Sequence, residues 1–254
     1  MMDAKVPVIS GFHPDPTICR VGEEYYLANS SFEYFPGAPL WRSLDLGEWS
    51  PVGNILSRRS QFARGDGRPS GGIFGSTLRH HAGRFWFVTT NMSDFGRGHL
   101  LVSAADPAGP WTDPVHFAGA IGIDPDLAWD ADGTCYLNWC SFTHGGAIAQ
   151  ARVDPHTGAL LEEPRLLWAG SGLAYPEGPH LYQRDGLWYL VIAEGGTERG
   201  HAVSVARAEH PTGPFEPHPA NPIFSHRSTP HPVQNVGHAD LIEHPDGTWS
   251  AVYL

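Results

Sequence analysis

The sequence predicts an all-β protein, a five-bladed β-propeller whose fifth blade is incomplete. Two repeated segments carry this prediction: one recurs five times along the chain, and a second follows each of the first four copies. In addition, 30 Gly and 23 Pro make up about a fifth of the 254 residues. That share is far above ordinary usage and argues against long helices.

The first repeated segment reads as a β-hairpin in each of its copies. It consists of an apolar and polar run, a turn that contains glycine, and an aromatic-rich run, which is typical of two paired strands. The turn glycines are spaced by 61, 50, 53 and 61 residues, too far apart for a helical solenoid and suited to a four-stranded blade. In chain order the copies span residues 16–32, 76–92, 125–142, 179–196 and 239–254.

The second repeated segment supplies the outer part of each predicted blade. It is a turn that ends in an aromatic or apolar anchor, followed by a strand that contains proline, at residues 43–56, 104–117, 152–167 and 208–224. The first segment occurs five times and the second only four times, because the sequence stops at Leu254. The fifth blade is therefore predicted to lack its second hairpin. A large β-sandwich with coincidentally similar turns is the alternative architecture.

Composition excludes several classes of partner and chemistry. The net charge is -11 and basic runs are absent, which argues against binding to a nucleic-acid backbone. Lys5 is the only lysine, so Schiff-base chemistry and a phosphate-binding loop lack a suitable residue. No stretch approaches the length of apolar sequence that spans a membrane, so no membrane partner is expected.

The cysteines and the N-terminal residues indicate a cytoplasmic location. The first residues contain neither an apolar core nor a small-residue cleavage site, so no secretory signal is expected. Cys19, Cys135 and Cys140 are odd in number and lack CxxC spacing. They are predicted to be reduced thiols inside a strand-rich core, as is usual in the cytoplasm.

Carboxylates recur where the first hairpins begin. Because the innermost strand of each blade lines a central channel, residues at equivalent positions converge on one axis. Three blades place a carboxylate there: Asp15, then Asp124 or Asp126, then Glu177; the fifth places His238. A single Asp-Pro pair is typical of a turn, but three carboxylates in a radial repeat predict a shared site.

Converging carboxylates suit either a metal site or a glycosidase. Glycoside hydrolysis needs one protonated carboxylic acid beside the leaving oxygen and one carboxylate across the sugar ring. A third carboxylate raises the pKa of the acid by like-charge repulsion. Aromatic side chains near the channel would stack on sugar faces, and the candidates are Phe32, Phe35, Phe74 and Trp139.

Five motifs resemble the family 43 glycoside hydrolases, most closely the β-xylosidase and α-L-arabinofuranosidase branch. They lie at residues 11–49, which begin GFHPDP, and at 122–137, 175–182, 192–197 and 236–243, in the order found in that branch. The resemblance covers essentially the whole chain. It implies a five-bladed propeller, in agreement with the repeat count.

The resemblance also implies roles for individual residues. Asp15 matches the general base that activates water, Glu177 the general acid, and Asp124 the auxiliary aspartate that raises the pKa of the acid and orients it. Asp126, two residues from Asp124, is the weaker candidate for that auxiliary role.

A further set of residues matches the sugar pocket. Phe32, Thr197 and His238 correspond to residues that line it, and Phe74 falls where relatives carry Trp or Tyr. No metal is needed for the chemistry, although the resemblance allows a structural calcium ion near His238.

The resemblance ends where the chain ends. Relatives complete the fifth blade, contribute an arginine from it to the sugar pocket, and usually add a C-terminal β-sandwich. Residues 1–254 are therefore predicted to be the catalytic propeller alone, C-terminally truncated, with self-association through the incomplete fifth blade.

The predicted function is an inverting exo-glycosidase that releases xylose or arabinose from small xylo- or arabino-oligosaccharides. Inversion requires the two carboxyl groups to stand about 6.5–9.5 Å apart, so that a water molecule fits between one of them and the sugar. Two alternatives remain: a weak or inactive propeller that binds carbohydrate or a partner protein, and an endo-arabinanase on the same scaffold.

Overall fold

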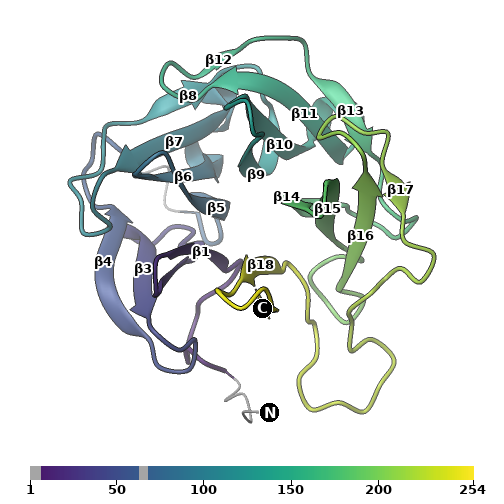
Figure 1. Ribbon diagram of the computed structural model, residues 1–254. Coiled ribbons are helices and arrows are strands. Elements are labelled where there is room, and N and C mark those ends of the chain that lie inside the picture. The colour runs from purple at the N-terminus through teal and green to yellow at the C-terminus, as the bar shows by residue number, and fades with distance from the viewer. Residues whose placement is uncertain (1–6, 63–67) are drawn as a thin grey trace.

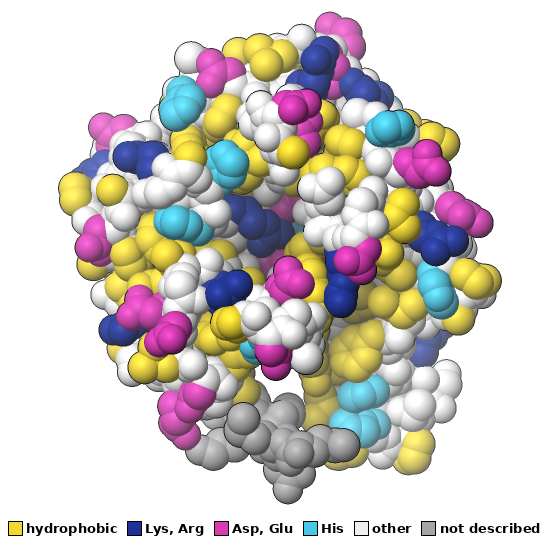
Figure 2. Space-filling view, viewed as in Figure 1, with side chains coloured by type: hydrophobic (Ala, Val, Ile, Leu, Met, Phe, Trp, Pro, Cys, Tyr) yellow, Lys and Arg dark blue, Asp and Glu magenta, His cyan; other side chains and the backbone are white. Residues whose placement is uncertain are grey.

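The computed structural model describes residues 7–62 and 68–254 and consists almost entirely of antiparallel strands. Four sheets stand around a central axis, and a two-stranded sheet lies between the last of them and the first (Figure 1). The centre of the ring is hollowed, with basic and acidic side chains visible inside it (Figure 2). The chain is therefore a β-propeller, as predicted.

Each of the four sheets runs outward from the axis in chain order. The first contains β1 (Thr17–Val21), β2 (Glu24–Ala28), β3 (Gly37–Ser43) and β4 (Ser50–Leu56). The second contains β5 (Ile73–His81), β6 (Arg84–Asn91), β7 (His99–Ala104) and β8 (Val115–Phe117).

The third contains β9 (Gly122–Trp129), β10 (Cys135–Ser141), β11 (Ala147–Asp154), β12 (Ala159–Leu160) and β13 (Arg165–Trp168). The fourth contains β14 (Glu177–Arg184), β15 (Leu187–Glu194), β16 (Ala202–Ala208) and β17 (Glu216–Pro217). Short 3₁₀ turns follow two of the second strands, η1 (Met92–Arg97) and η2 (Phe142–His144).

The predicted fifth blade is present only as a pair of strands. Residues 239–254 contain β18 (Asp240–Glu243) and β19 (Trp249–Val252), which pair with each other in a sheet of their own. All five predicted first hairpins thus form paired strands, and the all-β propeller is confirmed. The structure shows four blades and this two-stranded sheet, so the count of five blades is not confirmed.

The core lies between the blades. Large clusters of buried side chains join the first blade to the second, the second to the third and the third to the fourth. Trp139, Phe87 and Phe62 are among the largest fully buried side chains. The cluster beside β18 is much smaller, with Val191, Val203 and Ala239 as its buried members. Less apolar burial therefore holds the two-stranded sheet than holds the blades.

Polar contacts at the axis join β18 to the first blade. The carboxylate of Asp240 accepts hydrogen bonds from the hydroxyl of Thr17, at 2.7 Å, and from the backbone N–H of Ile18, at 3.0 Å. Because β18 and β1 lie more than 220 residues apart in the sequence, these bonds link the end of the chain to its beginning. They place β18 beside the axis, next to β1 (Figure 1).

Cys19, Cys135 and Cys140 are buried, unpaired thiols in the structure, as predicted. No helix among residues 7–62 and 68–254 has the length and apolar character to cross a membrane.

Candidate active site

The predicted carboxylates stand at equivalent places around the axis. Asp15 lies two residues before β1, Asp124 lies near the start of β9, and Glu177 is the first residue of β14. His238 lies two residues before β18. Since inner strands of neighbouring blades contact one another, these four residues gather at one mouth of the channel.

Close contacts confirm that they meet. Nδ1 of His238 lies 3.5 Å from Oδ1 of Asp15. A Cβ atom on Gly75 would lie 2.3 Å from Oδ1 of Asp124 and 3.1 Å from the His238 ring, and one on Gly178 would lie 3.0 Å from Nε2 of the same ring. His238 therefore stands among the carboxylates, and two glycines leave the space that the cluster occupies.

The backbone is unusual at three of these four positions. Asp15, Asp124 and His238 have positive φ angles of 49°, 55° and 46°. Residues other than glycine seldom adopt this left-handed conformation, and it concentrates at functional sites. The turn in the backbone aims each side chain at the axis instead of at the faces of its blade.

Bulges at the same end of three blades have a similar effect. The pairing register shifts between Ile73 and Ser76 on β5, between Asn138 and Cys140 on β10, and between Glu177 and His180 on β14. A bulge bends its strand and redirects side chains, and bulges are common beside active sites. These shifts flank Gly75, Asp124 and Glu177, where the chain enters the site.

Asp15 is held by hydrogen bonding and remains accessible. The Ser30 hydroxyl donates to its Oδ2 at 2.5 Å, while Oδ1 faces His238. The Asp15 side chain is 15% exposed, compared with 6% for that of His238. A water molecule can therefore reach the carboxylate while its orientation is fixed, which is the arrangement a general base needs.

Asp124 and Glu177 both have raised pKa values. Burial and the charge of Asp15 raise the pKa of Asp124 to about 8, although the Gly178 N–H donates to its Oδ2 at 3.2 Å and opposes the rise. Burial and then the charge of Asp124 raise the pKa of Glu177 to about 7, against an opposing contribution from His238. The two carboxyls titrate as a coupled pair, so the site retains a proton near neutral pH.

Two of the predicted pocket aromatics meet beside Asp15. The rings of Phe32 and Phe74 lie 5.3 Å apart at 71°, and Phe32 also contacts Phe12 at 5.7 Å. Phe12 is 63% exposed and its ring lies 6.2 Å from Tyr34, which is 60% exposed. These four rings, which we call the aromatic cluster, offer apolar surface of the kind that stacks on sugar faces.

The other pocket residues are placed differently. Thr197 is exposed in the segment after β15. Phe35 packs against Phe62 in the core, and Trp139 is fully buried. Phe35 and Trp139 are therefore core residues instead of stacking platforms.

Sequence reasoning missed Ser30, Gly75 and Gly178. Ser30 closes the first hairpin, and its hydroxyl contacts an aspartate 15 residues earlier in the chain. Gly75 and Gly178 each directly follow a predicted site residue, Phe74 and Glu177, and that adjacency was the only available signal. Their importance depends on a contact with a neighbouring blade, which a local pattern does not reveal.

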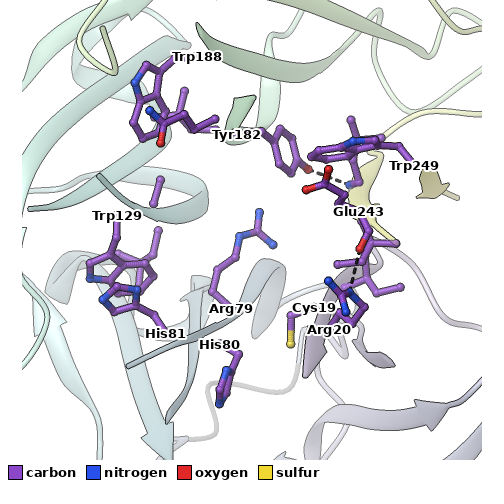
Figure 3. Close-up of a pocket in the computed structure, with 17 residues that line it drawn as sticks. Cys19, Arg20, Arg79, His80, His81, Trp129, Tyr182, Trp188, Glu243 and Trp249 are labelled. Carbon is purple, nitrogen blue, oxygen red and sulfur yellow. Dashed lines mark hydrogen bonds between the residues drawn. The ribbon is translucent and has the colours of Figure 1, made fainter. Parts of the chain in front are cut away.

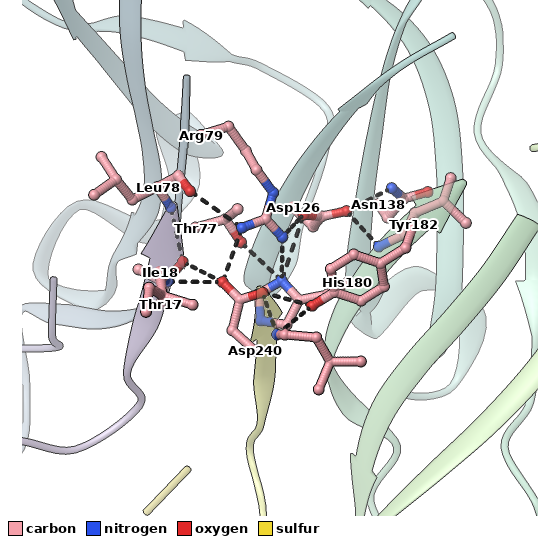
Figure 4. A network of polar contacts seen from close by, with 12 residues as sticks. Thr17, Ile18, Thr77, Leu78, Arg79, Asp126, Asn138, His180, Tyr182 and Asp240 are labelled. Carbon is pink, nitrogen blue, oxygen red and sulfur yellow. Dashed lines mark hydrogen bonds and ion pairs between the residues drawn. The ribbon is translucent and has the colours of Figure 1, made fainter. Parts of the chain in front are cut away.

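Asp126 belongs to a separate polar network deeper in the channel (Figure 4). Arg79 of β5 forms ion pairs with Asp126, at 3.0 Å, and with Asp240, at 2.8 Å. Oδ2 of Asp126 also accepts hydrogen bonds from the Asn138 side chain and from the backbone N–H of Leu181, both at 3.0 Å. Asp126 is therefore fully engaged, and Asp124 is the member of the pair that faces the carboxylates.

A cavity of about 350 Å³ lies beside Arg79, and Figure 3 shows its lining. Arg79, Tyr182, Trp129, Trp188 and Trp249 are among its lining residues. It contains none of the predicted site residues. The predicted carboxylates therefore lie outside this cavity.

The residues around His238 are a poor fit for a calcium ion. In the described part of the chain, no three His, Cys, Asp or Glu side chains come together as metal ligands. Nδ1 of His238 faces Asp15, whereas calcium takes about 6–8 oxygen ligands. No catalytic step is assigned to a metal.

Comparisons with known proteins agree with the geometry. A family model described as glycosyl hydrolases family 43 matches residues 4–254. A xylosidase/arabinosidase of Butyrivibrio fibrisolvens is 42% identical over 100% of this chain and 51% of its own length. A non-reducing end alpha-L-arabinofuranosidase of Bacteroides ovatus is also 42% identical, over 98% of this chain and 47% of its own.

A solved structure, a xylan beta-1,4-xylosidase from Bacillus halodurans, superimposes with a TM-score of 0.93 at 35% identity. The match covers 99% of this chain and 50% of that one. The chain thus spans about half the length of the relatives it matches.

Proposed function

The chain belongs to the glycosyl hydrolases family 43, and on that basis we propose that it is the catalytic propeller of an inverting glycosidase. The proposed enzyme releases xylose or arabinose from the ends of xylo- or arabino-oligosaccharides. The observation that carries the proposal is that three carboxyl groups from three blades meet at one mouth, two of them with raised pKa values.

In the proposed mechanism, Asp15 and Glu177 move the two protons. Asp15 takes a proton from water as the water oxygen bonds to the anomeric carbon. Glu177 gives its proton to the leaving oxygen as the glycosidic bond breaks. Asp15 then holds a proton and Glu177 is ionised, and exchange with solvent restores both. Burial and the charge of Asp124 raise the pKa of Glu177 to about 7, so most of the acid holds its proton below neutral pH.

Asp124 supports the acid in this proposal. Its charge is the second cause, after burial, of the raised pKa of Glu177. Its Oδ2 accepts the backbone N–H of Gly178, the residue that follows the acid. One carboxyl group thus acts on the proton affinity of Glu177 and holds the backbone beside it.

The substrate class rests on the relatives. Their printed names include xylosidase, arabinosidase and a non-reducing end arabinofuranosidase, which supports action at chain ends on pentoses. The aromatic cluster beside Asp15 provides a stacking surface for a sugar ring. Phe32 and Phe74 are proposed to contact the sugar, together with His238 and Thr197.

The test is hydrolysis by the purified chain. Aryl β-xyloside, aryl α-L-arabinofuranoside, xylobiose and a linear arabinan are supplied in parallel, and products are sized by chromatography. The proposal predicts monosaccharide as the first product from at least one of the first three substrates. Longer arabinan fragments as the first product would instead identify the endo-acting alternative.

A binding module is the second candidate, and the two-stranded sheet favours it. We propose that β18 and β19 are the first half of a fifth blade, held by a small core cluster. Such a site would bind sugar without the rigidity that turnover needs. Calorimetric binding of xylobiose with no hydrolysis of any supplied substrate would support this candidate over the enzyme.

Self-association is proposed for the same region. Among the described strands, β19 pairs with β18 alone. A cavity of about 540 Å³ lies beside it, with Val8, Trp49, Val252 and Tyr253 among its mainly apolar lining. A second copy of the chain is the proposed occupant, because an unpaired strand edge readily accepts another strand. Sedimentation should show dimers that Ala251→Lys disrupts, and a monomer at all concentrations contradicts the proposal.

The reaction is proposed to need no cofactor, because side chains carry out both proton transfers. Prolonged treatment with a chelator should leave turnover unchanged. A cytoplasmic location is also proposed, supported by three buried, unpaired cysteines.

A further inference from the structure

The inner strands of the third and fourth blades are joined by two carboxylates of β9. Asp124 accepts the backbone N–H of Gly178 at 3.2 Å, and Asp126 accepts the backbone N–H of Leu181 at 3.0 Å. Both donors belong to β14, the strand that begins with Glu177. Strand β9 therefore binds the backbone of β14 at two points that lie three residues apart on β14.

Asp126 is held by more side-chain contacts than Asp124. Its side chain is completely buried, and its Oδ2 is fixed by the Asn138 amide while its Oδ1 pairs with Arg79. Asp124, in contrast, accepts a single hydrogen bond from the described part of the chain and has a left-handed backbone. The contact of Asp124 falls inside the register shift between Glu177 and His180, and the contact of Asp126 falls one residue beyond it.

Glu177 pairs with Ala193 of β15, but the register then shifts and regular pairing resumes only at His180. The backbone between these two positions therefore depends on contacts with β9 as well. Asp126 anchors β14 just beyond the bulge, and Asp124 touches it just after Glu177. A shift of β14 at the residue bonded to Asp126 would change the distance between the carboxyl groups of Glu177 and Asp124.

We propose that Asp126 is a positioning residue, which sets where Glu177 stands relative to Asp124 and to the leaving oxygen. Its carboxylate is engaged in the Arg79 network (Figure 4) and acts on the acid through the backbone of β14. The inference rests on the proposed glycosidase function, since it concerns the acid of that reaction.

Asp240 provides a matched control. It is equally buried, pairs with the same Arg79, and also accepts a backbone N–H from the next inner strand, that of Ile18 in β1. The strand it holds follows Asp15, the proposed base, instead of the acid. Loss of either aspartate removes one Arg79 ion pair. In the described part of the chain, Asp240 contacts the strand of the acid only through the Tyr182 side chain, whereas loss of Asp126 removes a bond to the backbone of that strand.

The experiment compares Asp126→Ala with Asp240→Ala. For each folded variant, kcat/KM is measured on a nitrophenyl glycoside, whose leaving group needs little protonation, and on the disaccharide, whose leaving group needs a proton. Asp126→Ala should raise the ratio of the two values about tenfold over wild type, because a misplaced acid penalises the disaccharide. Asp240→Ala should change that ratio less than about threefold.

A pH profile gives a second readout. Glu177 is faced by Asp124 and Cys140 from the third blade, by Asp15 and by His238. With β14 displaced from Asp124, less repulsion acts on the acid, and the basic limb of kcat/KM should move toward lower pH in Asp126→Ala. Asp126→Asn keeps an acceptor for the Leu181 N–H and should restore the leaving-group ratio to near the wild-type value.

Two outcomes overturn the inference: equal ratios in the two Ala variants, or an unchanged ratio in a folded Asp126→Ala. If that variant does not fold, Asn138→Ala carries the same test, because it removes the bond that orients Asp126 and keeps the charge paired. A smaller rise in the ratio supports the proposal, and no rise contradicts it. Wild-type turnover tests the proposed function separately, since the ratio is defined only for an active chain.

Discussion

Nδ1 of His238 lies 3.5 Å from Oδ1 of Asp15, although the two residues come from opposite ends of the chain. The contact joins the segment before β18 to the segment before β1 and orients the proposed base together with Ser30. The two-stranded sheet therefore contributes directly to the site, through the residue that precedes it.

Replacement of the proposed base should stop the reaction regardless of the leaving group. In Asp15→Asn the described residues offer no second carboxylate at the place of the proposed base, so kcat should fall about 10²–10⁴-fold on every substrate. Ser30→Ala, which removes only the orienting bond, should cost much less. Turnover of the Asp15→Asn chain at a wild-type rate would rule out Asp15 as the base.

Replacement of the proposed acid should depend strongly on the leaving group. Glu177→Gln cannot protonate the leaving oxygen, so hydrolysis of the disaccharide should fall about 10²–10⁴-fold. Hydrolysis of a nitrophenyl glycoside should fall far less. Steady-state kinetics on both substrates provide the check, and equal losses on the two would contradict this role for Glu177.

Removal of the auxiliary carboxyl should shift the pH profile. Asp124 raises the pKa of Glu177, which stands at about 7, so Asp124→Asn should lower that pKa. The acid then loses its proton at lower pH, and the basic limb of kcat/KM moves toward the acid side. The profile is measured on the disaccharide, and an unmoved limb in a folded variant would assign Asp124 another role.

Gly75 offers a purely steric test of the cluster. In Gly75→Ala the new methyl group would lie 2.3 Å from Oδ1 of Asp124 and close to the His238 ring. Displacement of either group should lower kcat at least about tenfold. Gly96→Ala is the matched control, since nothing lies within 4 Å of its Cβ position and its φ is not restricted to glycine. Equal activity of the two variants would show that the site tolerates the shift.

The channel network should make stability depend on acid pH. The Arg79 guanidinium holds the pKa of the buried Asp240 well below its usual range. A lowered folded-state pKa contributes stability above the unfolded value of about 3.9 that is lost as pH falls further. Asp240→Asn should cost about 3–5 kcal/mol at pH 7 and flatten the pH dependence below pH 4. Urea unfolding at pH 7 and pH 3 measures both effects.

Much of the fold and the carboxylate site could be predicted because the chain repeats. Equivalent positions in successive hairpins predicted that Asp15, either Asp124 or Asp126, and Glu177 converge on one axis, and the family resemblance favoured Asp124. Local pattern also identified residues 239–254 as strands, but their sheet has only two members in the structure. The blade count depends on packing with other segments, which the hairpin repeat does not encode.

The ion pairs of Arg79 could not be predicted from the sequence, for a different reason. Arg79 meets Asp126 and Asp240 across 47 and 161 residues, and nothing in the sequence around Arg79 marks it as an ion-pair partner. Thr197, which a motif match predicts to line the pocket, has an exposed side chain, and its role stays a prediction. Contacts between blades decide where Arg79 forms its ion pairs.

The central claim is that Asp15 and Glu177 act on opposite sides of the sugar in a single displacement. Proton NMR of the first turnovers tests it most directly, because it distinguishes the anomers of the released sugar before they interconvert. With an aryl β-xyloside the α-anomer of xylose should appear first, and with an aryl α-L-arabinofuranoside the β-anomer of arabinose. Initial release of the anomer with the configuration of the substrate would contradict the account.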